Sequence, residues 1–161
     1  MHLKYKELWK NNIFSDNKSS HGSNKLRTYR LFKNYFIFEP YLEWGSDEKR
    51  RLITQFRISS HQLEIERGRY KNIPASQRIC KLCNADVEDE IHFLLSCQKT
   101  EKIRKEILNE IEDKFTNIKA LDNKSKFVWI LSAEDYYVYN QLYKLLTNLY
   151  AFRNETLTGN R

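Results

Sequence analysis

The feature that most constrains this chain is a cluster of three cysteines and one histidine. The stretch RICKLCNADVEDEIHFLLSC holds them in the pattern C-x2-C-x8-H-x4-C, and the chain has no other cysteine. The four residues are Cys80, Cys83, His92 and Cys97. Structural zinc sites are tetrahedral, and three cysteines with one histidine form a standard ligand set. The spacing therefore predicts one structural zinc ion that stabilises this segment.

Such a site leaves no open position for a water molecule. Four protein ligands complete the tetrahedron, so the ion would hold the fold rather than activate water. Two alternatives stay open: the thiols could be buried as small hydrophobic groups, or His61 could replace His92 as a ligand. A disulfide framework is disfavoured, because the cysteine count is odd and the N-terminal residues lack a signal-peptide pattern.

The composition favours a single helical domain. Of the 161 residues, 40% are hydrophobic and 30% are charged, with only 4 Gly and 2 Pro. This balance is typical of helices rather than of a turn-rich sandwich. The longest apolar run, residues 127–131, is too short to span a bilayer. We expect a mostly α domain of an intracellular protein, nuclear or cytoplasmic, with a CCHC knuckle and at most a short β-hairpin.

Three regions are expected along the chain. Residues 1–24 would form an N-terminal arm and a linker rich in Asn and Ser, residues 25–155 the zinc-containing domain, and residues 156–161 a loose C-terminus. Apolar residues at intervals of three and four predict amphipathic helices. These helices are expected at 26–36, 46–58, 100–115, 124–132 and 134–153. Alternating apolar and polar residues predict a short extended segment around 62–71.

Positive charge is concentrated in the N-terminal half. Residues 1–80 contain 16 Lys and Arg against 8 Asp and Glu, whereas residues 81–161 contain 12 against 13. A polarised excess favours an anionic partner, most commonly a nucleic acid. The alternative is a solvated helical surface with no partner.

Part of the chain resembles the region after the polymerase domain in reverse transcriptases of non-LTR retrotransposons. The resemblance covers residues 25–155 and is strongest across 50–97, where QFRISSHQLEIERGRY is followed by C-x2-C and EDEIHFLLSC. It implies a zinc-binding module that grips template RNA or target DNA. A polymerase body is a candidate partner of such a module. The family's zinc ligands match Cys80, Cys83, His92 and Cys97.

Two catalytic motifs of that family are missing. The chain has no pair of adjacent aspartates, which the polymerase needs for its metal ions. The nuclease of some relatives uses a Pro-Asp motif, but here Pro40 precedes Tyr41 and Pro74 precedes Ala75. The resemblance therefore implies the accessory module alone, either as a fragment or as a separate short protein.

Basic residues crowd the approach to the predicted zinc site and are the expected phosphate contacts. Tyr70 is a candidate for stacking on a base, with a core position as the alternative. Arg67 and Arg69 have the alternative of pairing with Glu64 and Glu66. The expected nucleic-acid contacts are Arg57, Arg67, Arg69, Lys71, Arg78 and Lys81.

Two other functions compete with nucleic-acid binding. A protein-interaction module would dock on a polymerase or another partner through amphipathic helices such as 100–115. A nuclease would need clustered acids, but no nucleophile with its base is recognisable, and the acids of 86–90 suit the start of a short helix. We therefore expect no enzymatic activity. The acids considered are Glu64, Glu66, Asp86, Glu88, Asp89 and Glu90.

Overall fold

The computed structural model of the protein describes residues 2–14 and 25–159. Within these ranges the regular elements are helices, and the nearest approach to a sheet is one antiparallel bridge between Ile79 and Val87. The predicted mostly α fold is confirmed. None of the described helices is long and apolar enough to cross a bilayer. The α-helices are α1 (His2–Phe14), α2 (Asp47–Arg57), α3 (Glu64–Tyr70), α4 (Glu101–Lys114), α5 (Asn123–Ser132) and α6 (Tyr136–Thr158).

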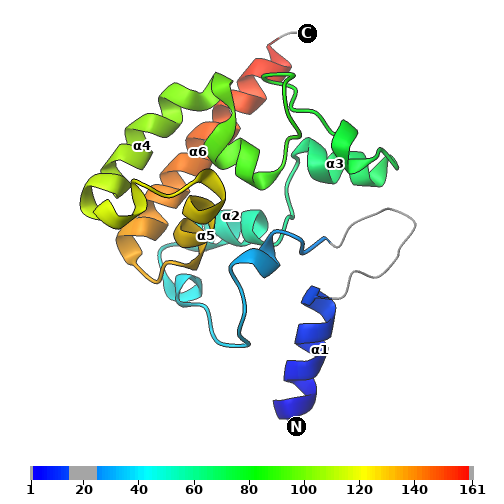
Figure 1. The fold of residues 1–161 in the computed structure, drawn as a ribbon, viewed down its shortest axis with the longest axis vertical. Coiled ribbons are helices and arrows are strands. Elements are labelled where there is room, and N and C mark those ends of the chain that lie inside the picture. The colour runs from blue at the N-terminus through cyan, green and yellow to red at the C-terminus, as the bar shows by residue number, and fades with distance from the viewer. Residues whose placement is uncertain (1, 15–24, 160–161) are drawn as a thin grey trace.

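The 23-residue helix α6 is the element against which α2 and α4 pack (Figure 1). Its buried stripe includes Val138, Leu142, Leu145 and Leu149, spaced at three and four residues. Asp135 caps its first turn, since the carboxylate accepts hydrogen bonds from two backbone N–H groups. Burying each large aliphatic side chain contributes roughly 1.5–3 kcal/mol, so this stripe is a main source of stability.

Aromatic side chains fill the centre of the molecule. Phe56 of α2 and Phe127 of α5 are fully buried, with ring centroids 6.3 Å apart. Phe93, from the turn after the third predicted ligand, lies 6.4 Å from Phe56 and 4.8 Å from the ring of Tyr150 in α6. The metal-ligand segment is therefore packed directly into the main core.

The prediction of a helix at 26–36 is wrong, because this range contains only a short 3₁₀ turn at Tyr29–Leu31. The chain instead turns back on itself, with Lys33 donating a hydrogen bond to the Ile37 carbonyl at 2.9 Å and lying 3.5 Å from Glu39. These polar contacts compete with a helical ladder. Most of the linker predicted before this region lies outside the described residues.

The extended segment predicted around 62–71 is also wrong, because α3 occupies Glu64–Tyr70. The alternation rule assumes that polar residues face water. Here Glu64 and Glu66 are buried together with Leu63 and Ile65, so four consecutive side chains are inside. Buried ion pairs, rather than a half-exposed strand, explain the pattern.

Helix α6 continues to Thr158, past the predicted end at residue 153. The expectation of a loose C-terminus is therefore wrong for residues 156–158. Phe152 and Leu157 pack against the buried cysteines, which gives this last part of the helix a partner. Packing on the ligand segment accounts for the extra length.

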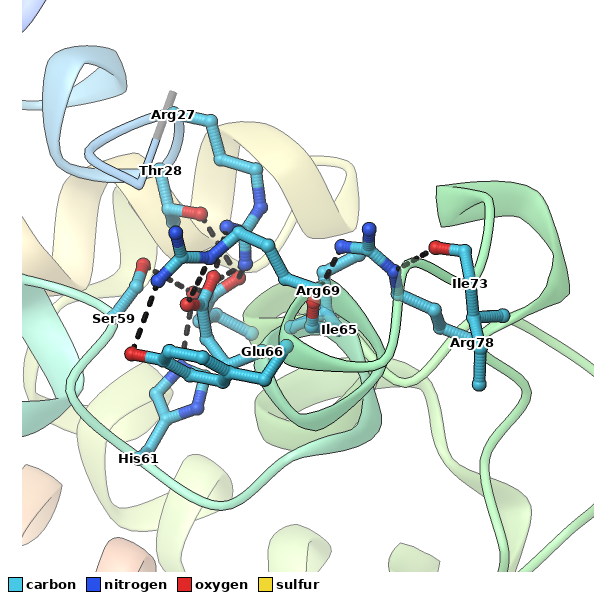
Figure 2. Close-up of polar contacts among 11 residues, drawn as sticks. Arg27, Thr28, Ser59, His61, Ile65, Glu66, Arg69, Ile73 and Arg78 are labelled. Carbon is cyan, nitrogen blue, oxygen red and sulfur yellow. Dashed lines mark hydrogen bonds and ion pairs between the residues drawn. The ribbon is translucent and has the colours of Figure 1, made fainter. Parts of the chain in front are cut away.

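A buried carboxylate, Glu90, joins segments that are far apart in the chain, and its partners Arg27, Thr28, Ser59 and His61 are labelled in Figure 2. Its oxygens lie 3.0 and 3.1 Å from the Arg27 guanidinium and accept hydrogen bonds from Thr28, Ser59 and His61. Burial alone would raise the pKa of Glu90, but the His61 hydrogen bond and the Arg27 charge outweigh it and lower the pKa to about 2. Glu90 therefore stays ionised at neutral pH and ties the N-terminal segment to the loop after α2.

A second buried pair links α6 to the ligand segment. The Arg153 guanidinium makes two hydrogen bonds of 2.8 Å to Glu88, and the two side chains are 3% and 0% exposed. Glu88 also accepts a hydrogen bond of 2.7 Å from the backbone N–H of Glu64. Glu88 thus connects α6, α3 and the segment between the second and third ligands.

We expect Arg153→Met to lower the free energy of unfolding by about 3–5 kcal/mol, since it leaves the Glu88 carboxylate buried without its partner. The double change Glu88→Gln with Arg153→Met should recover part of this loss, because the unpaired charge is removed. Chemical denaturation measures both effects. Lys105→Ala, on an exposed pair of α4, serves as the control and should change stability little. A single Arg153 variant as stable as the parent would contradict this role.

Candidate metal centre

The four predicted ligands converge on one point. Their ligand atoms all lie within 4.8 Å of one another. Cys80 Sγ lies 3.9 Å from Cys97 Sγ, and Cys83 Sγ lies 3.4 Å from Nε2 of His92. Metal–sulfur and metal–nitrogen bonds of the lengths seen in tetrahedral zinc sites imply separations of about 3.8 Å and about 3.6 Å. The cluster therefore has the dimensions of a four-coordinate metal centre.

A tight turn positions the first two ligands. The bridge between Ile79 and Val87 closes the turn, and the backbone N–H of Cys80 donates to the Asp86 carbonyl at 2.8 Å. Asn84 follows the second ligand with a φ of +54°, in the left-handed region. Asparagine adopts this region more readily than most residues other than glycine. The local sequence thus suits a turn that presents two thiols to one side.

A π-helical turn, His92–Ser96, positions the other two ligands. Asp89 accepts a hydrogen bond of 2.7 Å from the backbone N–H of His92, which anchors the start of the turn. The backbone N–H of Cys97 donates to the His92 carbonyl at 2.8 Å. This is the i to i+5 bond of a π turn, and it brings residues five apart onto the same side. The acids before His92 thus start a short helical turn, as predicted.

Burial and hydrogen bonds together set the pKa values of the cluster. It raises the pKa of the Cys80 thiol to about 12 and lowers the pKa of His92 below its usual value. Burial also opposes ionisation of Cys83, but backbone hydrogen bonds from Ala85 and Asp86 and contacts with the neighbouring cysteines outweigh it and lower that pKa. His92 is therefore in the neutral form that binds metals. A bound cation would displace the thiol protons.

Two buried arginines lie beside the cluster, and sequence reasoning missed both. Arg104 of α4 donates to the Cys97 carbonyl at 3.1 Å. Arg153 of α6 pairs with Glu88, whose Oε1 lies 3.8 Å from Cys80 Sγ. Three thiolates around a divalent ion carry a net negative charge, which nearby guanidinium groups stabilise.

A signal for these arginines was present in the sequence. Arg104 precedes the buried Ile107 and Ile111 of α4 at helical spacing, and Arg153 follows the buried Leu149 of α6 by four residues. A charged residue on the apolar face of a predicted helix is rarely buried without a partner. The pattern therefore indicates a buried ion pair or a nearby anionic site.

His61, the alternative fourth ligand, lies outside the cluster. Its Nε2 is 2.9 Å from Glu90, and its side chain is buried within the network of Figure 2. His92 is therefore the histidine of the metal centre. His61 instead contributes to the contacts that hold the loop after α2.

The six expected nucleic-acid contacts do not form one surface, because Arg57 is buried. Its guanidinium pairs with Glu39 and lies over the rings of Phe32 and Tyr41, at 4.5 and 4.6 Å from their centroids. It also donates to the Leu131 carbonyl. These contacts assign Arg57 to the core beneath the N-terminal segment.

Arg78 is buried as well. It donates to the carbonyl oxygens of Ile73 at 2.8 Å and Ile65 at 2.6 Å (Figure 2). A Cβ atom at Gly68 would lie 2.6 Å from Cγ of Arg78, so only glycine leaves room for this side chain. Arg78 therefore holds α3 against the segment before the first ligand.

The other four cations lie at the surface of α3 and of the turn that carries Cys80 and Cys83. Arg67 lies 3.6 Å and Lys81 3.1 Å from Glu64, and Arg69 lies 3.0 Å from Glu66. The local pairing considered for Arg67 and Arg69 is thus present. Lys71 is exposed. Tyr70 is 75% exposed, which excludes the core position considered for it.

Four of the six acids considered for a nuclease have structural partners. Glu64, Glu66, Glu88 and Glu90 are buried and lie beside arginines. In the described part of the chain, the Cys3His cluster is the one group of three or more His, Cys, Asp or Glu residues that lie close enough together to hold an ion.

The fold and the site define a small helical domain with a Cys3His cluster that could hold one metal ion. Comparisons with protein-family models, with curated proteins and with solved structures find no match for this chain.

We expect one tightly bound metal ion per chain, with stoichiometric binding lost in His92→Ala. His61→Ala should retain the metal, because His61 contacts Glu90 and not the cluster. Elemental analysis of protein purified under reducing conditions measures both. Removal of the ion by a chelator should also lower the melting temperature, since the unfolded chain has no preformed site. A folded parent protein without metal would contradict this assignment.

Proposed function

We propose that the chain is a zinc-stabilised nucleic-acid-binding module, derived from or part of a non-LTR retrotransposon reverse transcriptase. It would grip template RNA or target DNA. The donor set supports zinc, because three thiols and an imidazole suit it, whereas Mg²⁺ and Ca²⁺ prefer oxygen ligands. With four protein ligands the ion serves the fold, and the proposed role requires no catalysis.

The observation that carries the proposal is an exposed aromatic ring among cations on α3. Tyr70 is 75% exposed, and the Arg69 guanidinium lies 4.7 Å from its ring centroid. Lys71 follows it at the surface, and Arg67 is 39% exposed on the same short helix. Aromatic rings stack on unpaired bases and cations contact the phosphates, which is the usual combination in single-strand binding.

The cations near Glu64 exceed what this carboxylate can neutralise. Lys81, Arg67 and Arg153 lie 3.1, 3.6 and 3.8 Å from its Oε1. Arg153 is shared with Glu88, so three cations face two carboxylates. One positive charge is left over among these groups, which favours an anionic backbone.

We expect the combined change Arg67→Ala, Lys71→Ala and Lys81→Ala to weaken RNA and DNA binding by at least about tenfold at low salt. Each lost phosphate contact should reduce the slope of log affinity against log salt by about one unit. Fluorescence anisotropy across a salt series measures both quantities. Metal content and melting temperature report whether the fold is intact.

A matched control for this change lies on the C-terminal half. Lys102, Lys105 and Lys119 are also exposed, but acids surround them on and near α4. Their combined change to alanine should leave affinity unchanged. Equal losses from both triple variants would point to non-specific attraction by net charge, and would count against the α3 surface.

We expect Tyr70→Ala to weaken single-stranded binding by about tenfold and duplex binding little, because a ring stacks only on an unpaired base. Tyr70→Phe should retain affinity, since the ring and not the hydroxyl makes the contact. Titration of matched single and double strands distinguishes these outcomes. An equal loss of duplex binding in Tyr70→Ala would contradict stacking of Tyr70 on an unpaired base.

A second candidate function is docking on a protein partner, and the exposed apolar loop of Tyr35, Ile37 and Phe38 favours it. The apolar stripe of α4 is less suited to this role, because Ile107 and Ile111 are already buried against the rest of the domain. The affinity for a protein partner would change little as the salt concentration rises, whereas the affinity for a nucleic acid would fall steeply.

A further inference from the structure

The exposed apolar surface of the molecule is concentrated in its N-terminal segments. Among the described residues, the large hydrophobic side chains that are exposed elsewhere are Tyr70, Ile79 and Tyr136. Contiguous apolar patches on a soluble protein mark places where a partner binds. The exposed side chains of the N-terminal segments are Leu3, Tyr5, Leu8, Phe14, Tyr35, Phe36, Ile37, Phe38 and Leu42.

Four consecutive residues, 35–38, form the centre of this surface and are called the apolar loop below. Their side chains are between 40 and 71% exposed. The backbone of the loop is held in place, because Lys33 donates to the Ile37 carbonyl at 2.9 Å and the Ile37 N–H donates to the Tyr35 carbonyl at 3.0 Å. A loop that is already ordered loses little conformational entropy when a partner covers it.

The apolar loop lies between α1 and the junction of α5 and α6 (Figure 1). On the α1 side, the ring of Phe36 lies 5.7 Å from the ring of Trp9. The other three loop residues border a cavity together with Glu134, which lies between α5 and α6. The 3₁₀ turn Pro40–Glu43 follows the loop on this second side.

The two sides of the apolar loop differ in charge. Helix α1 carries the exposed cations Lys4, Lys6 and Lys10 and a single exposed acid. The other side carries the exposed acids Glu43 and Glu134. No ion pair within the described part of the chain uses any of these five side chains. Each molecule therefore has a basic edge and an acidic edge on either side of an apolar centre.

A second copy of the chain is the partner that this charge pattern favours. In a two-fold dimer both copies use the same surface, so the basic edge of each copy lies over the acidic edge of the other. A nucleic acid is disfavoured here, because residues 34–38 contain no cation and the acids Glu43 and Glu134 repel phosphates.

The cavity beside the apolar loop adds an argument from shape. Its volume is about 200 Å³, below the roughly 300–1,000 Å³ of small-molecule sites. Both polar and apolar groups line it, among them Lys33, Ser132 and Phe38. Such a space suits one side chain that combines an apolar ring with a polar tip, as Tyr35 of a second copy does. One surface thus offers both the projecting ring and the cavity, as a two-fold interface requires.

We propose that the chain forms a two-fold dimer through the apolar loop. The loops of the two copies pack on each other across the axis, and α1 of each copy lies against Glu43 and Glu134 of the other. Burial of the loops supplies the affinity, and the charges at the edges fix the orientation. The inference is independent of the proposed nucleic-acid function, and the dimer places two α3 surfaces in one particle.

Analytical ultracentrifugation of the zinc-loaded full chain over a range of concentrations tests the dimer. The mass should rise from that of one chain toward that of two between roughly 1 and 100 μM. Ile37→Asp and Phe38→Asp should each raise the dissociation constant at least about tenfold, because a charge then lies among apolar contacts. Tyr70→Asp changes an exposed aromatic residue of α3 and should leave the dimer intact. Metal content and melting temperature report whether each variant is folded.

Charge reversal tests which edges meet. The combined change Lys4→Glu, Lys6→Glu and Lys10→Glu makes both edges acidic, and Glu43→Lys with Glu134→Lys makes both edges basic. Each variant alone should stay monomeric at concentrations where the parent is dimeric, since like charges then face each other. An equimolar mixture of the two variants should recover the dimer at low salt, because each edge again meets its opposite.

Four results would overturn the inference. A parent that is monomeric throughout would mean that a different protein covers the apolar loop. Assembly beyond two copies would exclude closure by a two-fold axis. A dimer that persists in Phe38→Asp would place the contact elsewhere, and a mixture that stays monomeric would separate the two edges. None of these results changes what the α3 variants show about nucleic-acid binding, so the proposed function is tested separately.

Discussion

The Cys3His cluster joins parts of the chain that have little apolar surface of their own. Around the cysteines the apolar contacts come from buried Leu82 and from partly buried Phe152 and Leu157, far fewer than in the main core. The π-helical segment packs into the main core through Phe93, Leu94 and Leu95, whereas the turn that carries Cys80 and Cys83 has few such contacts. A structural zinc ion held by such a cluster would contribute roughly 10–16 kcal/mol of binding free energy, which in structural zinc sites is also folding free energy. The rest of the domain can then be built from ordinary amphipathic helices.

The short segment from Glu88 to His92 places its side chains against different parts of the fold. Glu88 faces Arg153 of α6, Glu90 faces Arg27 and His61, and His92 faces the thiols. Alternate residues of one short segment therefore contact three different parts of the fold. Glu88 and Glu90, two of the acids considered for a nuclease, are occupied in this way, which is why clustering in sequence does not make them a catalytic site.

The basic residues of the N-terminal half divide into two groups with different physical roles. Arg27, Arg57 and Arg78 are largely buried and hold segments together through carboxylates and backbone carbonyls. Lys71 and Lys81 remain at the surface. A count of charge along the sequence overstates the surface available to an anionic partner, because charges consumed by internal pairing no longer attract one. The proposed interface is accordingly narrower than the sequence suggested, and centred on Tyr70.

The convergence of the four candidate ligands and the main helices were predictable from the sequence because both depend on contacts between near neighbours. A turn joins Cys80 to Cys83, a single i to i+5 bond joins His92 to Cys97, and the apolar spacing of α2, α4 and α6 follows from the pitch of the helix. The partners of the charged residues were decided by the tertiary structure. Arg27 meets Glu66 across 39 residues and Arg153 meets Glu88 across 65. Local patterns carry no information about such distant pairs, so α3 looked like a strand and Arg57 and Arg78 looked like surface cations. Burial depends on which segments the fold brings together, and only the folded chain shows that.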